Sequence, residues 1–113
     1  MSAAQGSWTD LGVTVASGDH VSISASGTYG VAGSDPGKTP SGVGCSGSGL
    51  PGDKDQSLQA WTPIGRVGSQ TPFCVGGQVS FVATASGDLQ VILNDDVYGD
   101  NWGGFTVHWT ITG

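Results

Sequence analysis

Near the C-terminus, the stretch from Asn94 to Asn101 combines residue types that bind metal ions. It holds three carboxylates, Asp95, Asp96 and Asp100, and two carboxamides within eight residues. Without a cation, each nearby pair of carboxylates repels by roughly 1 to 3 kcal/mol at about 6 Å. The stretch contains no Lys, Arg or His that could neutralise this charge. Carboxylate, carboxamide and carbonyl oxygens suit the flexible coordination of Ca2+, so the pattern predicts a calcium loop.

The residues around this loop exclude an EF-hand, which needs a Glu where Phe105 or Thr106 stands here. Apolar and polar residues alternate on both sides, so we expect the loop to join two strands. The apolar positions are Leu89, Val91 and Leu93 before the loop and Phe105, Val107, Trp109 and Ile111 after it. An acidic, glycine-rich turn without a ligand is the simpler alternative, but the density of carboxylates favours a metal site.

The composition favours an all-β protein. The chain has 113 residues, 21 of them Gly, and all nine acidic residues are Asp. Good helix formers are scarce, while Val, Thr, Ser and Gly suit short strands and tight turns. We therefore expect about eight strands in a small β-sandwich of jelly-roll type, with residues 1–113 forming one domain.

Turn residues divide the chain into its expected elements. Similar Ser-Gly-Asp turns occur at residues 17–19 and 86–88, and the first predicts a hairpin between strands at 11–15 and 21–25. Residues 60–68 predict an interrupted pair of strands, and residues 72–75 another short strand. Before these strands, residues 33–55 are rich in Gly, Ser and Pro and predict a long irregular loop, which in a compact domain is often functional.

Most aromatic residues fall at strand positions and are expected in the core: Trp8, Trp61, Trp109, Phe73, Phe81 and Phe105. Trp102 and Tyr98 instead lie within the predicted calcium loop. For Trp102, contact with a ligand and packing within the loop are equally supported by the sequence. His20 and His108 have Ser and Thr as neighbours and are expected to face solvent.

The net charge of −6 excludes several classes of function. Lys38, Lys54 and Arg66 are the only basic residues besides histidine, too few for a nucleic-acid or anionic-membrane surface. No apolar run approaches the roughly 20 residues of a membrane span. The two cysteines, Cys45 and Cys74, favour a secreted protein with one disulfide, and two buried free thiols are the alternative.

The strand-flanked loop also resembles a known family. Residues 91–95 followed by residues 100–107 are similar to the calcium-loop signature of the PA-IL-like family, the bacterial galactose-binding lectins and related modules of glycoside hydrolases. Residues 64–68 and 73–76 resemble the family in order and spacing. The resemblance implies a small jelly-roll sandwich in which one calcium ion bridges the protein and a sugar.

The resemblance also implies roles for individual residues. The side chains of Asp95, Asp100 and Asn101 would bind calcium, with the backbone carbonyl of Val97 and that of Val31, or of Tyr29 if the alignment shifts by two. The implied sugar-binding residues are Asp53, Gln56, Asp95, Val97, Asp100 and Trp102. This chain departs from the family in a loop two residues shorter, in Val97 where the family has Thr, and in Asp53 where it has His.

We therefore expect a secreted, calcium-dependent lectin or carbohydrate-binding module that prefers galactosides. The alternative is an extracellular structural or adhesive domain in which calcium only stabilises the loop. An enzyme is not expected, because no catalytic pair or triad has a supporting motif. The sequence is compatible with both a monomer and a homo-oligomer.

Overall fold

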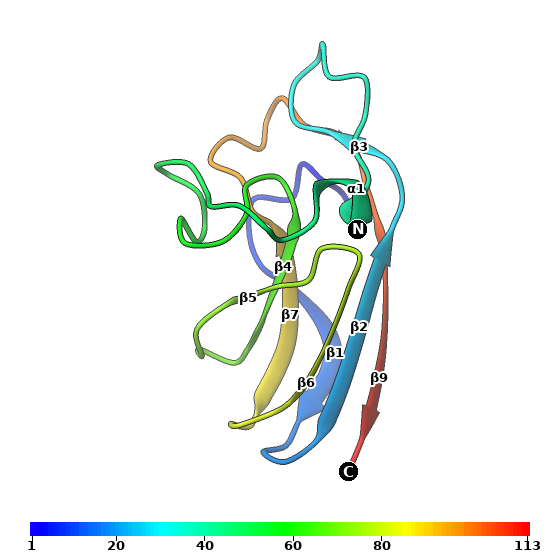
Figure 1. Cartoon of the computed structure of the whole chain (residues 1–113), viewed down its shortest axis with the longest axis vertical. Coiled ribbons are helices and arrows are strands. Elements are labelled where there is room, and N and C mark those ends of the chain that lie inside the picture. Colours follow the sequence, from blue (N-terminus) through cyan, green and yellow to red (C-terminus); the bar gives the residue numbers. More distant parts are fainter.

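The computed structural model describes residues 1–113 and confirms the all-β prediction (Figure 1). One helical turn, α1 (Pro40–Val43), interrupts a series of nine strands. The strands are β1 (Thr9–Val15), β2 (His20–Ser26), β3 (Tyr29–Gly30), β4 (Pro63–Val67), β5 (Phe73–Cys74), β6 (Gln78–Val82), β7 (Gly87–Leu93), β8 (Trp102–Gly103) and β9 (Thr106–Thr112). The chain has no helix of the length and apolarity that a membrane crossing requires.

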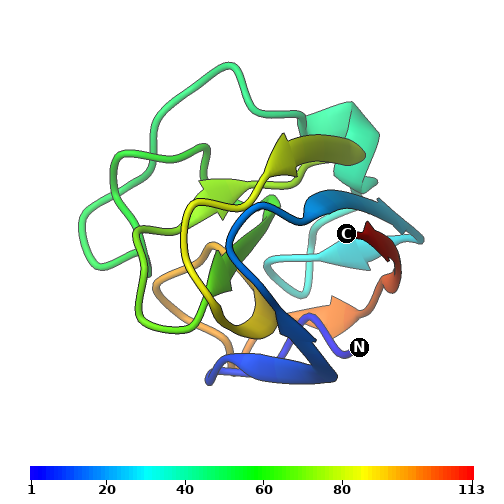
Figure 2. The same ribbon diagram turned by 90° about the horizontal axis from the view of Figure 1, so that it is seen from below.

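Two antiparallel sheets form the layers of a sandwich (Figures 1 and 2). The first has the strand order β1-β7-β4-β5 and the second β6-β2-β9, while β3 and β8 pair as a separate short ribbon. Alternate residues of the central strands point into the core, such as Leu89 and Val91 on β7 and Val21 and Ile23 on β2. This alternation is the period-two pattern of the sequence, and it confirms the predicted β-sandwich.

The predicted hairpin of the first two strands is wrong. β1 pairs with β7, and β2 pairs with β6 and β9, so the turn at residues 17–19 carries the chain from one sheet to the other. The turn between β6 and β7 does the same, and the two turns lie side by side. The Gly18 N–H donates to the Ala83 carbonyl at 2.7 Å, and the Ala83 N–H donates to the Asp19 carbonyl at 2.8 Å.

Two further expectations need correction. Residues 60–68 do not form an interrupted strand pair, because β4 is one strand that bonds to β7 on one edge and to β5 on the other. Trp109 was expected in the core but is 39% exposed. Its strand, β9, forms an edge of its sheet, so no further strand covers the ring. His20 and His108 are exposed, as expected.

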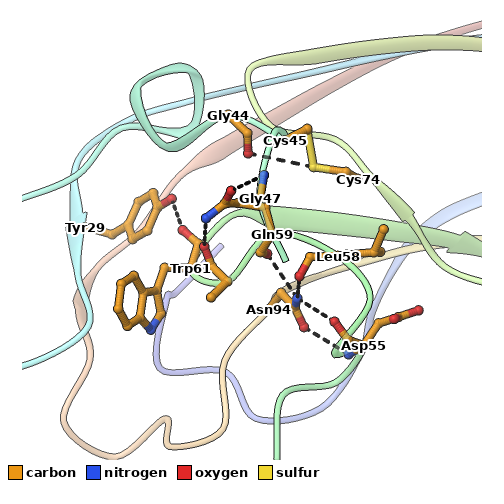
Figure 3. Close-up of a disulfide and its surroundings, with 11 residues drawn as sticks. Tyr29, Gly44, Cys45, Gly47, Asp55, Leu58, Gln59, Trp61, Cys74 and Asn94 are labelled. Carbon is orange, nitrogen blue, oxygen red and sulfur yellow. Dashed lines mark hydrogen bonds between the residues drawn. A yellow bond between two sulfur atoms is a disulfide. The ribbon is translucent and has the colours of Figure 1, made fainter. Parts of the chain in front are cut away.

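Cys45 and Cys74 form a disulfide, with their Cα atoms 6.0 Å apart (Figure 3). Cys45 follows α1 within the long irregular segment, and Cys74 lies on β5. The bridge therefore attaches that segment to the first sheet.

Candidate metal and ligand site

The predicted calcium loop lies at one end of the sandwich, between β7 and β8, together with the loops at residues 31–38 and 49–56. Figure 1 shows all three at the end opposite the C-terminus. The N-terminal residues also reach this loop, because the Ala3 N–H donates to the Gly103 carbonyl at 3.1 Å. The Asn101 carboxamide in turn donates to the Ala3 carbonyl at 2.8 Å. The site is thus assembled from four separate parts of the chain.

Asp95 is the most deeply buried carboxylate of the loop, with 3% of its surface exposed. Its Oδ1 accepts hydrogen bonds from the N–H groups of Asp96 at 2.8 Å and Val97 at 3.4 Å, whereas its buried Oδ2 has no partner. Burial raises the pKa of Asp95, although the hydrogen bonds from the two N–H groups partly oppose this shift. A buried carboxylate oxygen without a donor is costly unless a cation neutralises it.

Two more carboxylates lie beside Asp95. One oxygen from each of Asp53, Asp95 and Asp96 lies within 4.8 Å of the other two. Asp53 Oδ1 is likewise buried without a partner, and burial, followed by the charge of Asp96, raises the pKa of Asp53. Three negative groups at this spacing repel one another, and the repulsion is stronger because part of the cluster is shielded from water.

Asn101 and Val31 are two further predicted ligands, and they flank the β3–β8 ribbon. Asn101 Oδ1 is also buried and unpartnered, so three of the four such side-chain atoms in the chain belong to Asp53, Asp95 and Asn101. The ribbon ends where Gly30 pairs with Trp102, so Val31 and Asn101 are the next residues on its two strands. No hydrogen bond outside the strands ends on the Val31 carbonyl, whereas the Tyr29 carbonyl accepts one from the Lys38 N–H at 2.7 Å. Of the two predicted carbonyls, that of Tyr29 is therefore already engaged.

Asp35 fixes the loop that carries Val31. Its carboxylate accepts hydrogen bonds from the N–H groups of Val31 and Gly37, both at 3.0 Å, and forms an ion pair with Lys38 at 3.3 Å. These two backbone hydrogen bonds are the main reason why the pKa of Asp35 is lowered. The sequence analysis did not single out Asp35, although an Asp followed two residues later by Gly is a common sign of such a turn.

Asn94 has a structural role that the sequence analysis missed. Its side chain is completely buried, and Oδ1 accepts a hydrogen bond from the Asp55 N–H at 3.0 Å (Figure 3). Its Nδ2 donates to the carbonyl groups of Asp55, Leu58 and Gln59 at 2.9, 3.2 and 3.0 Å. Asn94 is therefore unavailable to a metal ion. It instead fastens the segment after Asp53 next to Asp95.

The remaining predicted site residues lie at the surface. Asp100, Val97 and Gln56 are exposed, and Asp100 is not among the three clustered carboxylates. The Gln56 carboxamide makes no hydrogen bond within the chain, while its backbone carbonyl accepts one from the Gly49 N–H at 2.9 Å.

The two aromatic residues of the loop pack locally. The Trp102 ring lies against Gly30, where even a Cβ atom would collide with it, and its indole N–H donates to the Ala32 carbonyl at 3.1 Å. The ring remains 37% exposed. The Tyr98 hydroxyl donates to the Leu93 carbonyl at 2.7 Å, and burial, together with the nearby carboxylates, raises the pKa of Tyr98 to about 12.

No positive group of the chain neutralises the acidic cluster. The only ion pair is the one between Lys38 and Asp35. Arg66 bonds to Gln90 and lies over the Trp8 ring, and the N-terminal ammonium donates to the Phe105 carbonyl. Lys54 is exposed, with its ammonium 5.8 Å from the centre of the Tyr98 ring. The donor set is made of hard oxygens with uncompensated negative charge, and it fits a calcium ion.

Comparison with known proteins finds a lectin domain with a similar fold. No protein-family model matches the chain, and no curated protein sequence matches it. A solved structure described as the EclA N-terminal domain, a PllA-like lectin, is similar to it, with a TM-score of 0.74 and 25% sequence identity. The match covers 98% of this chain and 92% of that chain. The resemblance to the PA-IL-like lectins is therefore confirmed, because this chain has the fold of a PllA-like lectin domain along almost its entire length.

Proposed function

We propose that residues 1–113 form one calcium-dependent carbohydrate-binding domain, a lectin or lectin-like module that prefers galactosides. The observation that carries this proposal is the buried, unpartnered Oδ2 of Asp95, which lies beside Asp53 and Asp96 on a lectin fold. The disulfide supports secretion into an oxidising, extracellular compartment. In this proposal the domain binds its carbohydrate ligand and does not catalyse a reaction on it.

Asp95 and Asn101 are the central calcium ligands in this proposal. Both present buried oxygens that no donor of the chain satisfies. The Val31 carbonyl is favoured over that of Tyr29 as a backbone ligand, because the Tyr29 carbonyl already accepts a hydrogen bond from Lys38. Asp100 and the Val97 carbonyl complete the proposed set from the exposed part of the loop, which would have to turn inward when calcium binds.

Sugar recognition follows from the same groups. When bound, calcium supplies positive charge and coordination positions for a vicinal pair of sugar hydroxyls. Neighbouring carboxylates, Asp53 and Asp100 among them, accept hydrogen bonds from those hydroxyl groups. In this proposal the free carboxamide of Gln56 and the exposed part of the Trp102 ring tune which sugar is chosen.

A domain with a purely structural calcium is the second candidate. The packing of Trp102 against Gly30 favours this second candidate, because a ring that packs against the protein has less surface free to contact a ligand. The two candidates differ in whether calcium-loaded protein binds galactosides.

Calcium is expected to stabilise the protein. A ligand that binds only the folded state at a hundredfold excess over its Kd adds about 2.7 kcal/mol, which raises the Tm of a domain of this size by roughly 10 °C. Thermal denaturation of calcium-loaded protein with and without EDTA measures the shift. Asp95→Asn is expected to abolish most of it, whereas Asp10→Asn, on the distant strand β1, retains it. Identical melting curves with and without EDTA would refute the metal site.

Galactoside binding is expected to require calcium. Calorimetric titration of methyl galactoside should show binding in calcium chloride and an affinity lower by more than about 100-fold in EDTA, equivalent to about 2.7 kcal/mol. Equal affinity in both buffers would refute the mechanism. Calcium binding without binding of galactosides, or of other sugars on a glycan array, would favour the structural candidate.

A further inference from the structure

Asp53 belongs to a different loop from the other acidic residues of the site, yet its carboxylate is oriented toward them. Oδ2 accepts a hydrogen bond from the Leu50 N–H at 2.8 Å, within its own loop. The other oxygen, Oδ1, is buried without a partner, and the carboxylate lies within the 4.8 Å group that contains Asp95 and Asp96. One oxygen thus holds the side chain in place and leaves the other for a ligand.

The loop around Asp53 packs closely against the predicted calcium loop. Gly52 has a φ of +92°, which favours glycine, and a Cβ atom there would lie 3.1 Å from the Cβ of Asp96. A Cβ atom at Gly49 would lie 2.8 Å from Asp53 Oδ2. A side chain at Gly52 would therefore push the two loops apart, and a side chain at Gly49 would displace the Asp53 carboxylate. The hydrogen bonds between the Asn94 side chain and the Asp55 backbone also hold this loop in place.

This arrangement is unfavourable without a cation. Asp95, Asp96 and Asp53 bring like charges together where Asp95 is 3% exposed, and every positive group of the chain is engaged elsewhere or lies outside ion-pair distance. A calcium ion shared by the two loops would convert this mutual repulsion into attraction.

We propose that Asp53 is itself a calcium ligand, so that calcium binding locks the loop at residues 49–56, with Gln56, against the loop at residues 94–101. The proposal rests on the calcium site proposed above and adds a ligand from the second loop. Its consequence is that the cation both contacts the sugar and assembles the surface that selects it. Without calcium, the 49–56 loop is expected to open readily.

Asp53→Asn tests this role, because Asn preserves the shape and the acceptor for the Leu50 N–H but removes the charge. Asp55→Asn is the matched control. It removes a charge two residues away in the same segment, where the Asp55 carboxylate bonds only to Ser57. Calorimetric titration with calcium chloride should show a Kd raised about tenfold or more for Asp53→Asn and changed less than about threefold for Asp55→Asn. Hydrogen exchange of residues 49–56 should slow on calcium addition in the wild type and much less in Asp53→Asn.

Melting in EDTA separates a ligand from a merely structural residue. If Asp53 is a ligand, Asp53→Asn relieves repulsion and melts at or above the wild-type temperature in EDTA, but below it in calcium. A lower melting temperature in EDTA, or equal calcium affinities for the two variants and the wild type, would overturn the role of Asp53 and leave the calcium site standing. A wild-type protein that binds no calcium would overturn both proposals.

Discussion

Asn94→Ala is expected to lower the free energy of unfolding by about 3–4 kcal/mol. The substitution removes four hydrogen bonds from a completely buried position, and it leaves one N–H and three carbonyl groups of the segment 55–59 without that partner. Urea denaturation in EDTA measures this loss without any contribution from bound calcium. Because this segment contains Gln56 and directly follows Asp53, the variant should also bind calcium more weakly.

Gln90→Ala is the control for this prediction. Gln90 lies on β7, the strand that directly precedes Asn94, and is half-buried, but its side chain accepts a single hydrogen bond, from Arg66 at 2.7 Å. Gln90→Ala should therefore lower the free energy of unfolding by about 1 kcal/mol or less. Equal losses for the two variants would show that Asn94 does not fasten the segment in the way its contacts indicate.

Removing the disulfide is expected to have an effect of similar size. The bridge joins residues separated by 29 positions, so its loss through the double substitution Cys45→Ala and Cys74→Ala should lower the free energy of unfolding by about 3.5 kcal/mol. Urea denaturation of the double variant and of oxidised wild type gives the difference.

Reduced wild-type protein is the control for the disulfide, because it loses the bridge but keeps both sulfur atoms. It should match the double variant to within about 1 kcal/mol. Intact-mass measurement after alkylation should find no modified cysteine in the oxidised protein. Two alkylated cysteines, or a double variant as stable as the wild type, would contradict the prediction.

The sequence was informative where local chemistry decides the structure. Alternation of apolar residues identified β2, β7 and β9, because side chains of a strand point to opposite faces in turn. It could not determine which strands pair. A Ser-Gly-Asp turn reverses the chain equally well within a sheet or between two sheets, and the choice at residues 17–19 depends on β7 and β9, far away in sequence.

The candidate site was predictable to a similar degree. Asp95 and Asn101 stand out in the sequence, and in the structure each has one buried oxygen without a partner. Asn94 has the same residue type as Asn101, so composition alone cannot separate a structural carboxamide from a ligand. Only the structure separates the two roles, because it buries the whole Asn94 side chain among backbone carbonyl groups. The approach of Asp53 to Asp96 likewise depends on how a glycine-rich loop folds back.

The C-terminus of the chain lies far from the site, whereas the N-terminal residues contact it. Gly113 follows β9 at the end of the sandwich opposite the loops, as Figure 1 shows, whereas Met1 bonds to Phe105 and Ala3 bonds to Asn101. Attachment through the C-terminus to a bead or sensor surface would thus turn every copy's loops outward. Neighbouring copies could then engage a clustered ligand together, and avidity would raise the apparent affinity well above that of one domain. A tag placed before Met1 would instead crowd the loop that holds Asn101.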